Sequence, residues 1–396
     1  MPLFRRGLPA RGALLIRVVG LLLVVQLLGA ACAGDDDEGD GAADVPISSL
    51  DTASTVDGTA GDAVSWWFEA PCGDEPDCRP PRPDDLPAST VELAAGHTDE
   101  LVLDQPDAIL VGGEGTTLGL VEIEAPGVTI VGVEIDTIVI LPGGNGAHLE
   151  ANRIGQLFVN GADDVVVRGN LIRPFDIGPD AIQIKTFDGD QPENLLVEAN
   201  VIGPQDSDGE IHTDCVQILG GDELRFVRNI VMPCGDKAFQ IRSGAGGDIG
   251  TVILEGNFIL ECVEQRAGCE GFHAITWAST ETTALVLRHN TIRGSVGISS
   301  GGSTIDPGDN FIAVGNIASS LPCTAGTSDN LTVTVEACEG RGVQAEFPEF
   351  LDDRPGVGDL RLVDPESVPV AAAPFGPSID GRPSCAAPRY GASTDC

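Results

Sequence analysis

The chain has 396 residues and a formal net charge of −39 at neutral pH, from 61 acidic and 22 basic residues. Such a surface repels nucleic acid and anionic lipid, so the composition excludes proteins that bind either of them through charge. The chain holds 51 Gly and 27 Pro but only 4% aromatic residues. This composition favours short strands joined by tight turns over long helices.

Residues 1–31 have the pattern of an export signal. Four arginines precede an apolar run over 18–28, and three small residues lead to Cys32. The segment 28–32 resembles a bacterial lipobox, which implies a lipid on Cys32, after cleavage, facing the outside of the cell membrane. The acidic stretch that completes 32–47 suits a disordered tether. Ordinary cleavage with secretion, or an uncleaved anchor helix, remains an alternative.

The cysteines support an oxidising compartment. There are eleven, and setting Cys32 aside leaves ten that fall into near pairs along the chain. No paired C-x-x-C motif occurs, so the spacing does not predict a zinc–thiolate site. Five local disulfides are predicted: Cys72/Cys78, Cys215/Cys234, Cys262/Cys269, Cys323/Cys338 and Cys385/Cys396.

A repeat begins after a Pro-rich leader, 48–87, which we interpret as an N-terminal cap. The unit is apolar-x-apolar-x-x-Asn-x-Ile, and it recurs at steps of 18 to 33 residues, a size that fits one solenoid coil each. Asn is expected at the bend because it tolerates the left-handed conformation, and its side chains can stack from coil to coil. Val133 occupies the Asn place in one early copy. The ladder is expected at Asn152, Asn170, Asn200, Asn229, Asn257, Asn290 and Asn316.

These features predict an all-β fold, a right-handed single-stranded parallel β-helix over 88–345 with a closing segment over 346–396. The opening coils near 91–113, the Asn ladder, and the closing motifs near 358–362 and 377–392 resemble the pectate-lyase-like right-handed β-helix superfamily. The resemblance implies this fold over about 88–394. It leaves activity open, because the fold serves lyases, hydrolases, epimerases and noncatalytic adhesins.

A second strand also repeats from coil to coil. Alternation sends its aliphatic residues inward, so Gln183, Gln217 and Gln240 are expected to stack outward in one column. Lys185 and Arg242 belong to the next outward column. The turns before these strands carry Asp180, Asp214, Lys237 and His273.

The resemblance implies a substrate groove on this face, where a basic residue removes the proton alpha to a uronate carboxylate and a cation holds that carboxylate. Both lysines of the chain, Lys185 and Lys237, fall here. Lys237 and Arg242 are the first candidates for base and carboxylate partner, and the next are Lys185, His212 and Asp214. The expected sugar contacts are Gln183, Gln217, Gln240, His273 and Trp277. No cofactor is required by the sequence; calcium is the candidate, and the acids that could supply its oxygens are Asp180, Asp188, Asp190, Asp206, Asp208 and Asp214.

We therefore expect a monomeric cell-surface protein that binds or cleaves an extracellular polysaccharide. β-Elimination by a lyase is the favoured reaction, and glycoside hydrolysis is the next. The alternative is a noncatalytic surface scaffold or adhesin, which the low aromatic content and the acidic charge favour. In that case the Gln column is an amide ladder that pairs with itself, and the Lys and Asp residues at the turns fix the coil register.

Overall fold

The computed structural model describes residues 90–93, 95–112, 115–174, 179–205, 212–243, 247–260, 273–278, 284–300, 303–304, 310–333 and 342–344. All of them belong to the second of two units, Pro46–Cys396. The predicted signal, tether, leader and closing segment lie outside these residues. Within the described part of the chain, no helix is long and apolar enough to cross a membrane.

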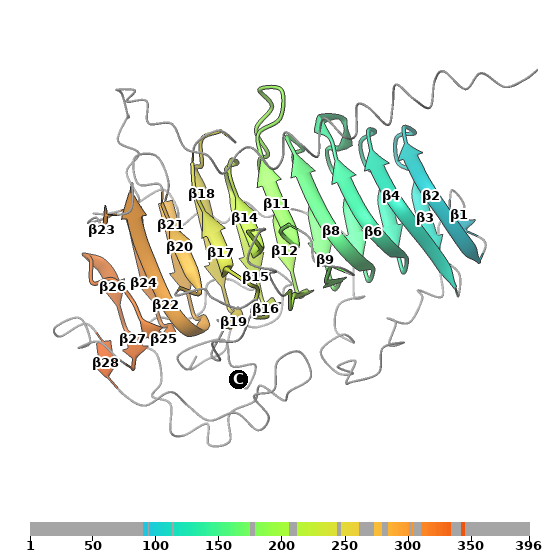
Figure 1. The fold of residues 1–396 in the computed structure, drawn as a ribbon. Coiled ribbons are helices and arrows are strands. Elements are labelled where there is room, and N and C mark those ends of the chain that lie inside the picture. Colours follow the sequence, from blue (N-terminus) through green and yellow to red (C-terminus); the bar gives the residue numbers. More distant parts are fainter. Residues whose placement is uncertain are drawn as a thin grey trace, which may run out of the picture. The chain divides into compact units, whose positions relative to one another are not determined.

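One parallel sheet, sheet A, takes a single short strand from each coil. Its strands lie side by side in sequence order, each hydrogen-bonded to the strand of the next coil (Figure 1). The strands are β1 (Thr90–Leu93), β3 (Ile109–Gly112), β5 (Thr129–Val131), β7 (His148–Glu150), β9 (Val166–Arg168), β12 (Leu196–Glu198), β15 (Leu224–Val227), β18 (Thr251–Glu255), β21 (Ala284–Arg288), β24 (Phe311–Val314) and β26 (Gly326–Ser328).

The other parallel sheet, sheet B, begins with one long strand per coil and then divides into two rows. The long strands are β2 (Gly96–Leu103), β4 (Thr116–Ile123), β6 (Glu134–Ile140) and β8 (Arg153–Asn160). The first half of β8 pairs with a row made of β10 (Leu171–Ile172), β13 (Val201–Ile202), β16 (Ile230–Val231) and β19 (Phe258–Leu260). Its second half pairs with a row made of β11 (Ile182–Lys185), β14 (Asp214–Ile218), β17 (Lys237–Ile241) and β20 (Ile275–Trp277).

Both rows of sheet B rejoin on β22 (Thr291–Ser300), which pairs with β19 and with β20. Parallel pairing then continues through β25 (Ile317–Ser320), β27 (Asn330–Thr332) and β28 (Gly342–Gln344). The remaining elements are the antiparallel β23 (Ser303–Thr304) and the 3-10 helix Pro142–Gly144. Coils that stack in sequence order with parallel strands make this a parallel β-helix, as the repeat predicts.

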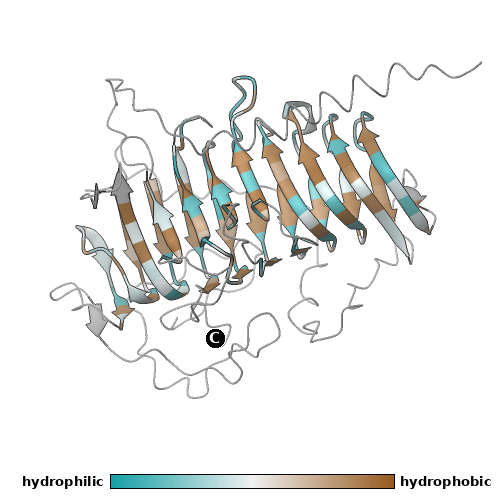
Figure 2. Ribbon diagram, viewed as in Figure 1, coloured by the Kyte–Doolittle hydropathy of each residue, from teal (hydrophilic) through white to brown (hydrophobic). Residues whose placement is uncertain are grey.

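The core follows from the alternation along these short strands. Aligned residues of β11, β14, β17 and β20 point inward: Ile182, Val216, Phe239 and Ile275 are in register and fully buried. Figure 2 shows hydrophobic positions repeating at similar places along neighbouring strands. Each coil therefore buries its apolar face against the coils on either side, which is why the stack needs many coils to be stable.

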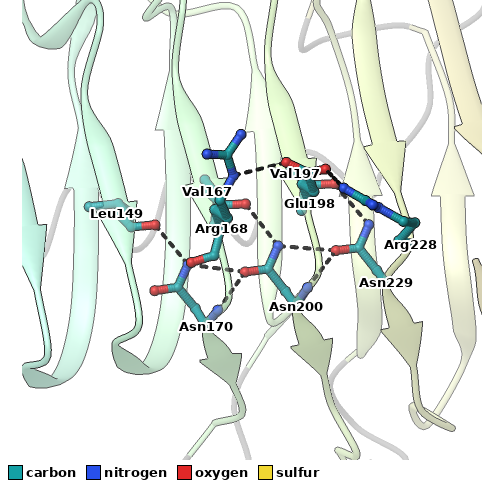
Figure 3. Close-up of polar contacts among 9 residues, drawn as sticks. All are labelled: Leu149, Val167, Arg168, Asn170, Val197, Glu198, Asn200, Arg228 and Asn229. Atoms are coloured by element: carbon teal, nitrogen blue, oxygen red, sulfur yellow. Dashed lines mark hydrogen bonds and ion pairs between the residues drawn. The ribbon is translucent and has the colours of Figure 1, made fainter. Parts of the chain in front are cut away.

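The Asn ladder is present and includes a residue that the repeat did not reveal, Asn330. Each Asn backbone amide donates to the Oδ1 atom of the next Asn at 2.8–2.9 Å, and each Nδ2 donates to the same oxygen at 2.9–3.1 Å. Nδ2 also donates to a carbonyl of the preceding coil, as Asn200 does to Val167 (Figure 3). Val133 closes the first rung, with its amide 3.0 Å from Asn152 Oδ1.

The expected reason for Asn at this bend is wrong. The left-handed residue is the one before each Asn, with φ of 57° at Ala151, 57° at Ala199, 55° at Arg228 and 50° at His289. A glycine takes that place in other coils, for example Gly169 at φ 62°. The left-handed residue makes the bend, and the Asn is selected because its amide pairs with both neighbouring coils.

A buried carboxylate lies beside this ladder on sheet A. Glu198 is 1% exposed and lies between two arginines, with Arg168 Nε 2.9 Å from Glu198 Oε2 and Arg228 contacting Oε1 (Figure 3). Register places Glu198 opposite Arg168 on the previous coil. The charge is therefore paired twice, which is the condition under which a buried carboxylate is tolerated.

One predicted disulfide joins adjacent coils. Cys215 and Cys234 are bonded, with a Cα–Cα distance of 5.3 Å, and both are buried. Cys323 is also disulfide-bonded, while its predicted partner Cys338 lies outside the described residues. So do the other cysteines of the predicted pairs: Cys72, Cys78, Cys262, Cys269, Cys385 and Cys396.

Candidate functional site

Charged side chains gather where the strands of the second row of sheet B begin. Asp214 opens β14 and Lys237 opens β17, and the two are paired in register. Asp180 precedes β11 by two residues, and the amide of Ala181 donates to the Asp214 carbonyl oxygen at 3.2 Å. Parallel strands lie about 4.8 Å apart, so these residues are neighbours on successive coils. With His212 and Asp236 they form what we name the acidic edge cluster.

Two carboxylates of this cluster are almost fully buried. Asp180 is 3% exposed and Asp214 is 0% exposed. The Asp214 backbone amide donates to Asp180 Oδ1 at 2.9 Å, and Gln183 Nε2 donates to Asp180 Oδ2 at 3.3 Å. These two donors fix the orientation of the Asp180 carboxylate.

His212 gives the cluster its route to solvent. Its Nδ1 lies 3.2 Å from Asp214 Oδ2 and 3.9 Å from Asp236 Oδ2, while its side chain is 33% exposed. Asp236 is held in turn, because its Oδ2 accepts the Thr213 backbone amide at 2.9 Å. The imidazole therefore bridges a buried carboxylate and a half-exposed one.

The cluster leaves polar atoms without hydrogen bonds. Both carboxylate oxygens of Asp214 are buried and have no hydrogen-bond partner among the described residues. His212 Nδ1 is in the same condition, and its approach to Asp214 Oδ2 at 3.2 Å is an ion pair when the imidazole is protonated. Buried polar atoms are rarely left so, since each one loses the free energy of its hydration.

Burial and mutual repulsion shape the titration of the cluster. Burial, reinforced by the Asp214 charge, raises the pKa of Asp180 to about 7. Burial also raises the pKa of Asp214, although His212 and Lys237 oppose that shift. Contact with the Asp214 carboxylate raises the pKa of His212 against the effect of burial. The two buried carboxylates and the imidazole therefore influence one another's protonation, and they titrate as a coupled group.

The structure separates the two cations that were paired as base and carboxylate partner. Lys237 begins β17, whereas Arg242 follows its last residue and is exposed. Five residues of strand span about 16 Å, so the two side chains lie at opposite ends of this row. Lys185 ends β11, on the same side as Arg242, and burial lowers its pKa. Of the predicted catalytic residues, the structure thus brings together Lys237, His212 and Asp214.

The Gln column forms as an amide ladder that pairs with itself. Gln183 Nε2 donates to Gln217 Oε1 at 2.8 Å, and Gln217 Nε2 donates to Gln240 Oε1 at 3.0 Å. Gln183 and Gln217 are 5% and 6% exposed, and Gln240 is half-buried. Their hydrogen-bonding capacity is therefore largely used within the column, as the alternative interpretation of the column predicts.

Two other predicted sugar contacts have different outcomes. Trp277 is fully buried and stacks on Phe311 with ring centroids 6.1 Å apart, so the expectation that it contacts a sugar is wrong. His273 is exposed, and its Nδ1 lies 2.7 Å from Ser295 Oγ. Its ring rests on Gly297, where a Cβ would come within 2.8 Å. Burial and the Lys237 charge lower the pKa of His273, so it lies close to the acidic edge cluster.

The acids expected from the loops do not join the cluster. Asp188 and Asp190 are exposed in the turn Phe187–Asp190, beyond the far end of β11. Asp206 and Asp208 lie outside the described residues. Asp236 was missed by the sequence reasoning, although its place directly before Lys237 aligns it with the strand start.

The cluster has the dimensions of a metal site. One ligand atom each from Asp180, His212 and Asp214 lie within 4.8 Å of one another. No known family model, curated protein or solved structure gives a significant match to this chain.

Proposed function

We propose that this chain is a cell-surface β-helix protein that binds an extracellular polysaccharide along sheet B and cleaves it at the acidic edge cluster. The observation that carries the proposal is the convergence of two carboxylates, an imidazole and an ammonium group at the start of β11, β14 and β17. We also propose that it belongs to the pectate-lyase-like superfamily and that a lipid on Cys32 anchors it outside the cell.

β-Elimination suits this arrangement better than hydrolysis. Glycosidases place two carboxyl groups on either side of the scissile bond, about 5 to 9.5 Å apart. Asp180 and Asp214 instead share one buried corner, with oxygens within 4.8 Å, which leaves no room for a glycosidic bond between them. Elimination needs one base and a cationic environment for the substrate carboxylate. Lys237 is our candidate base.

The column of Lys185 and Arg242 supports a role in binding. Both side chains sit on the outer face at the far end of the strands, two coils apart, and the molecule has a large excess of acids. Coils about 4.8 Å apart put these cations about 10 Å from each other along the axis. They are our candidates for holding an anionic glycan while the bond is broken at the cluster.

The matched test uses the two lysines of the chain. The purified chain is incubated with a panel of polyuronates, with and without calcium, and the ultraviolet absorbance of the unsaturated product is followed. Lys237→Ala should abolish product formation, whereas Lys185→Ala should raise KM and leave kcat within about threefold. The proposal is contradicted if the wild type forms no product from any polyuronate of the panel, or if both variants lose kcat equally.

The self-paired Gln ladder and the buried Trp277 favour the second candidate, a noncatalytic scaffold or adhesin. In that case the wild type retains polysaccharides on an affinity gel without forming product. Retention that survives Lys185→Ala and Arg242→Ala together would remove the outer cationic column from the binding face.

A further inference from the structure

We propose that Asp180, His212 and Asp214 bind a divalent transition-metal ion of the zinc or manganese type. The use of such an ion in cleavage rests on the proposed function, whereas binding itself does not. The three residues come from two adjacent coils, at the starts of β11 and β14.

Distance is the first argument. The three ligand atoms lie within 4.8 Å of one another. Two ligands on one ion, each about 2.0–2.4 Å from it, are separated by no more than about twice that length. The spacing of the three atoms is therefore within the range at which they can share one ion.

The unpaired atoms of Asp214 are the second and independent argument. This side chain is 0% exposed, and neither carboxylate oxygen has a hydrogen-bond partner in the described part of the chain. His212 Nδ1 is also buried without such a partner, 3.2 Å from Asp214 Oδ2. A cation placed between these atoms would satisfy all of them together.

Groups around the three ligands orient them. The Asp214 amide and Gln183 Nε2 hold the two Asp180 oxygens, so that carboxylate is fixed before any ion arrives. Such outer contacts are typical of metal sites, where they set the direction of each ligand.

Ligand type and charge select the class of ion. Calcium and magnesium prefer oxygen ligands alone, whereas an imidazole with carboxylates suits zinc or manganese. The two ligand carboxylates supply a charge that balances a divalent ion. The nearby Asp236 carboxylate and Lys237 ammonium offset each other. The site therefore accommodates the ion without leaving a large unbalanced charge in the core.

The test measures binding directly on the full chain, freed of metal with a chelator. Zinc chloride and manganese chloride are titrated by calorimetry, and bound manganese is followed by electron paramagnetic resonance. We expect one ion per chain and a higher Tm. Asp214→Asn and His212→Gln should each weaken binding by about 100-fold or more. Asp188→Asn, an exposed acid outside the cluster, is the matched control and should bind as the wild type does.

Several results would overturn the site. They are the absence of binding, equal binding by all variants, or a preference for calcium over both transition metals. Circular dichroism shows whether Asp214→Asn folds, and the half-exposed His212 supplies a second variant if it does not. Cleavage that persists in chelator would support the proposed function and show that the reaction does not need the metal. Metal binding without cleavage would support the metal site and contradict the proposed function.

Discussion

Two groups of polar side chains run from coil to coil in this β-helix, the Asn ladder and the acidic edge cluster. They differ in whether their buried polar atoms have hydrogen-bond partners. In the Asn ladder, Asn229 is fully buried, its Oδ1 accepts two hydrogen bonds, and its Nδ2 donates two. In the acidic edge cluster, Asp214 is just as buried, yet neither of its side-chain oxygens has such a partner among the described residues. Hydrogen-bonded groups stabilise the stack, whereas a buried carboxylate whose oxygens lack hydrogen bonds destabilises it, and proteins retain such groups mainly where they act.

The ladder is where the largest loss of stability is expected. Asn229→Ala removes four hydrogen bonds and leaves the buried Asn200 backbone amide without the acceptor that it has in the wild type. We expect the free energy of unfolding to fall by about 3 kcal/mol or more, measured by chemical denaturation. Asn160→Ala is the control, because Asn160 is buried outside the ladder and its Oδ1 has no hydrogen-bond partner among the described residues. Equal losses in the two variants would contradict the special role of the ladder.

A substitution in the acidic edge cluster should instead raise the free energy of unfolding. In metal-free protein at neutral pH, Asp214→Asn replaces a buried carboxylate with an amide that can donate to Asp180 or to His212 Nδ1. The free energy of unfolding should rise by about 1 kcal/mol, as is common when a strained functional group is removed. Thermal denaturation in chelator measures the change. A variant clearly less stable than the wild type would show that the Asp214 charge is structural, and the contrast between the ladder and the cluster would fail.

A smaller change in the free energy of unfolding is expected for substitutions on sheet A, where Glu255 and Glu198 differ in their contacts with arginines. Burial raises the pKa of Glu255 despite three arginines nearby, so the folded protein favours its protonated form. Its contribution to stability is therefore present below the ordinary pKa of 4.5 and is lost as pH rises through the folded value. Glu255→Gln should stabilise the protein by about 0.5 kcal/mol at pH 7 and by nothing near pH 3.

Melting curves of Glu255→Gln and the wild type across that pH range provide the measurement. Glu198→Gln is the matched control, because Glu198 is paired by Arg168 and Arg228 and should lose stability at pH 7 on substitution. A gain that does not shrink at low pH would assign the effect of Glu255→Gln to packing.

The fold was predictable because the same sequence pattern recurs in successive coils. The Asn-x-Ile unit and the inward aliphatic positions gave the coil, and register confirms both. The same alternation predicts the inward place of Trp277, since it aligns with Ile241, and its assignment to a sugar overlooked that signal. The left-handed residue was visible as Gly169 or Gly256 one place before the Asn.

The site was predictable only in part, because its geometry depends on contacts between coils. The sequence places Asp180, Asp214 and Lys237 at equivalent strand starts, and the structure agrees. The approach of His212 to Asp214 depends on the path of the turn that precedes β14, which no repeat encodes. The separation of Lys237 from Arg242 follows from strand rise alone and was available from the sequence.

The Asn ladder also has a direction. Every Nδ2 donates toward the next coil, so the side-chain amide dipoles from Asn152 to Asn316 point the same way. Side-chain amides orient in the field of the protein, and aligned hydrogen bonds strengthen one another. The stack is thus electrically polar along its axis. The first Asn of the ladder, Asn152, presents an oxygen that accepts the Val133 amide, and the last, Asn330, presents hydrogens that the carbonyls of Ala313 and Ser328 accept. The two ends of the ladder are therefore closed by opposite chemistry, a backbone donor at one end and backbone acceptors at the other.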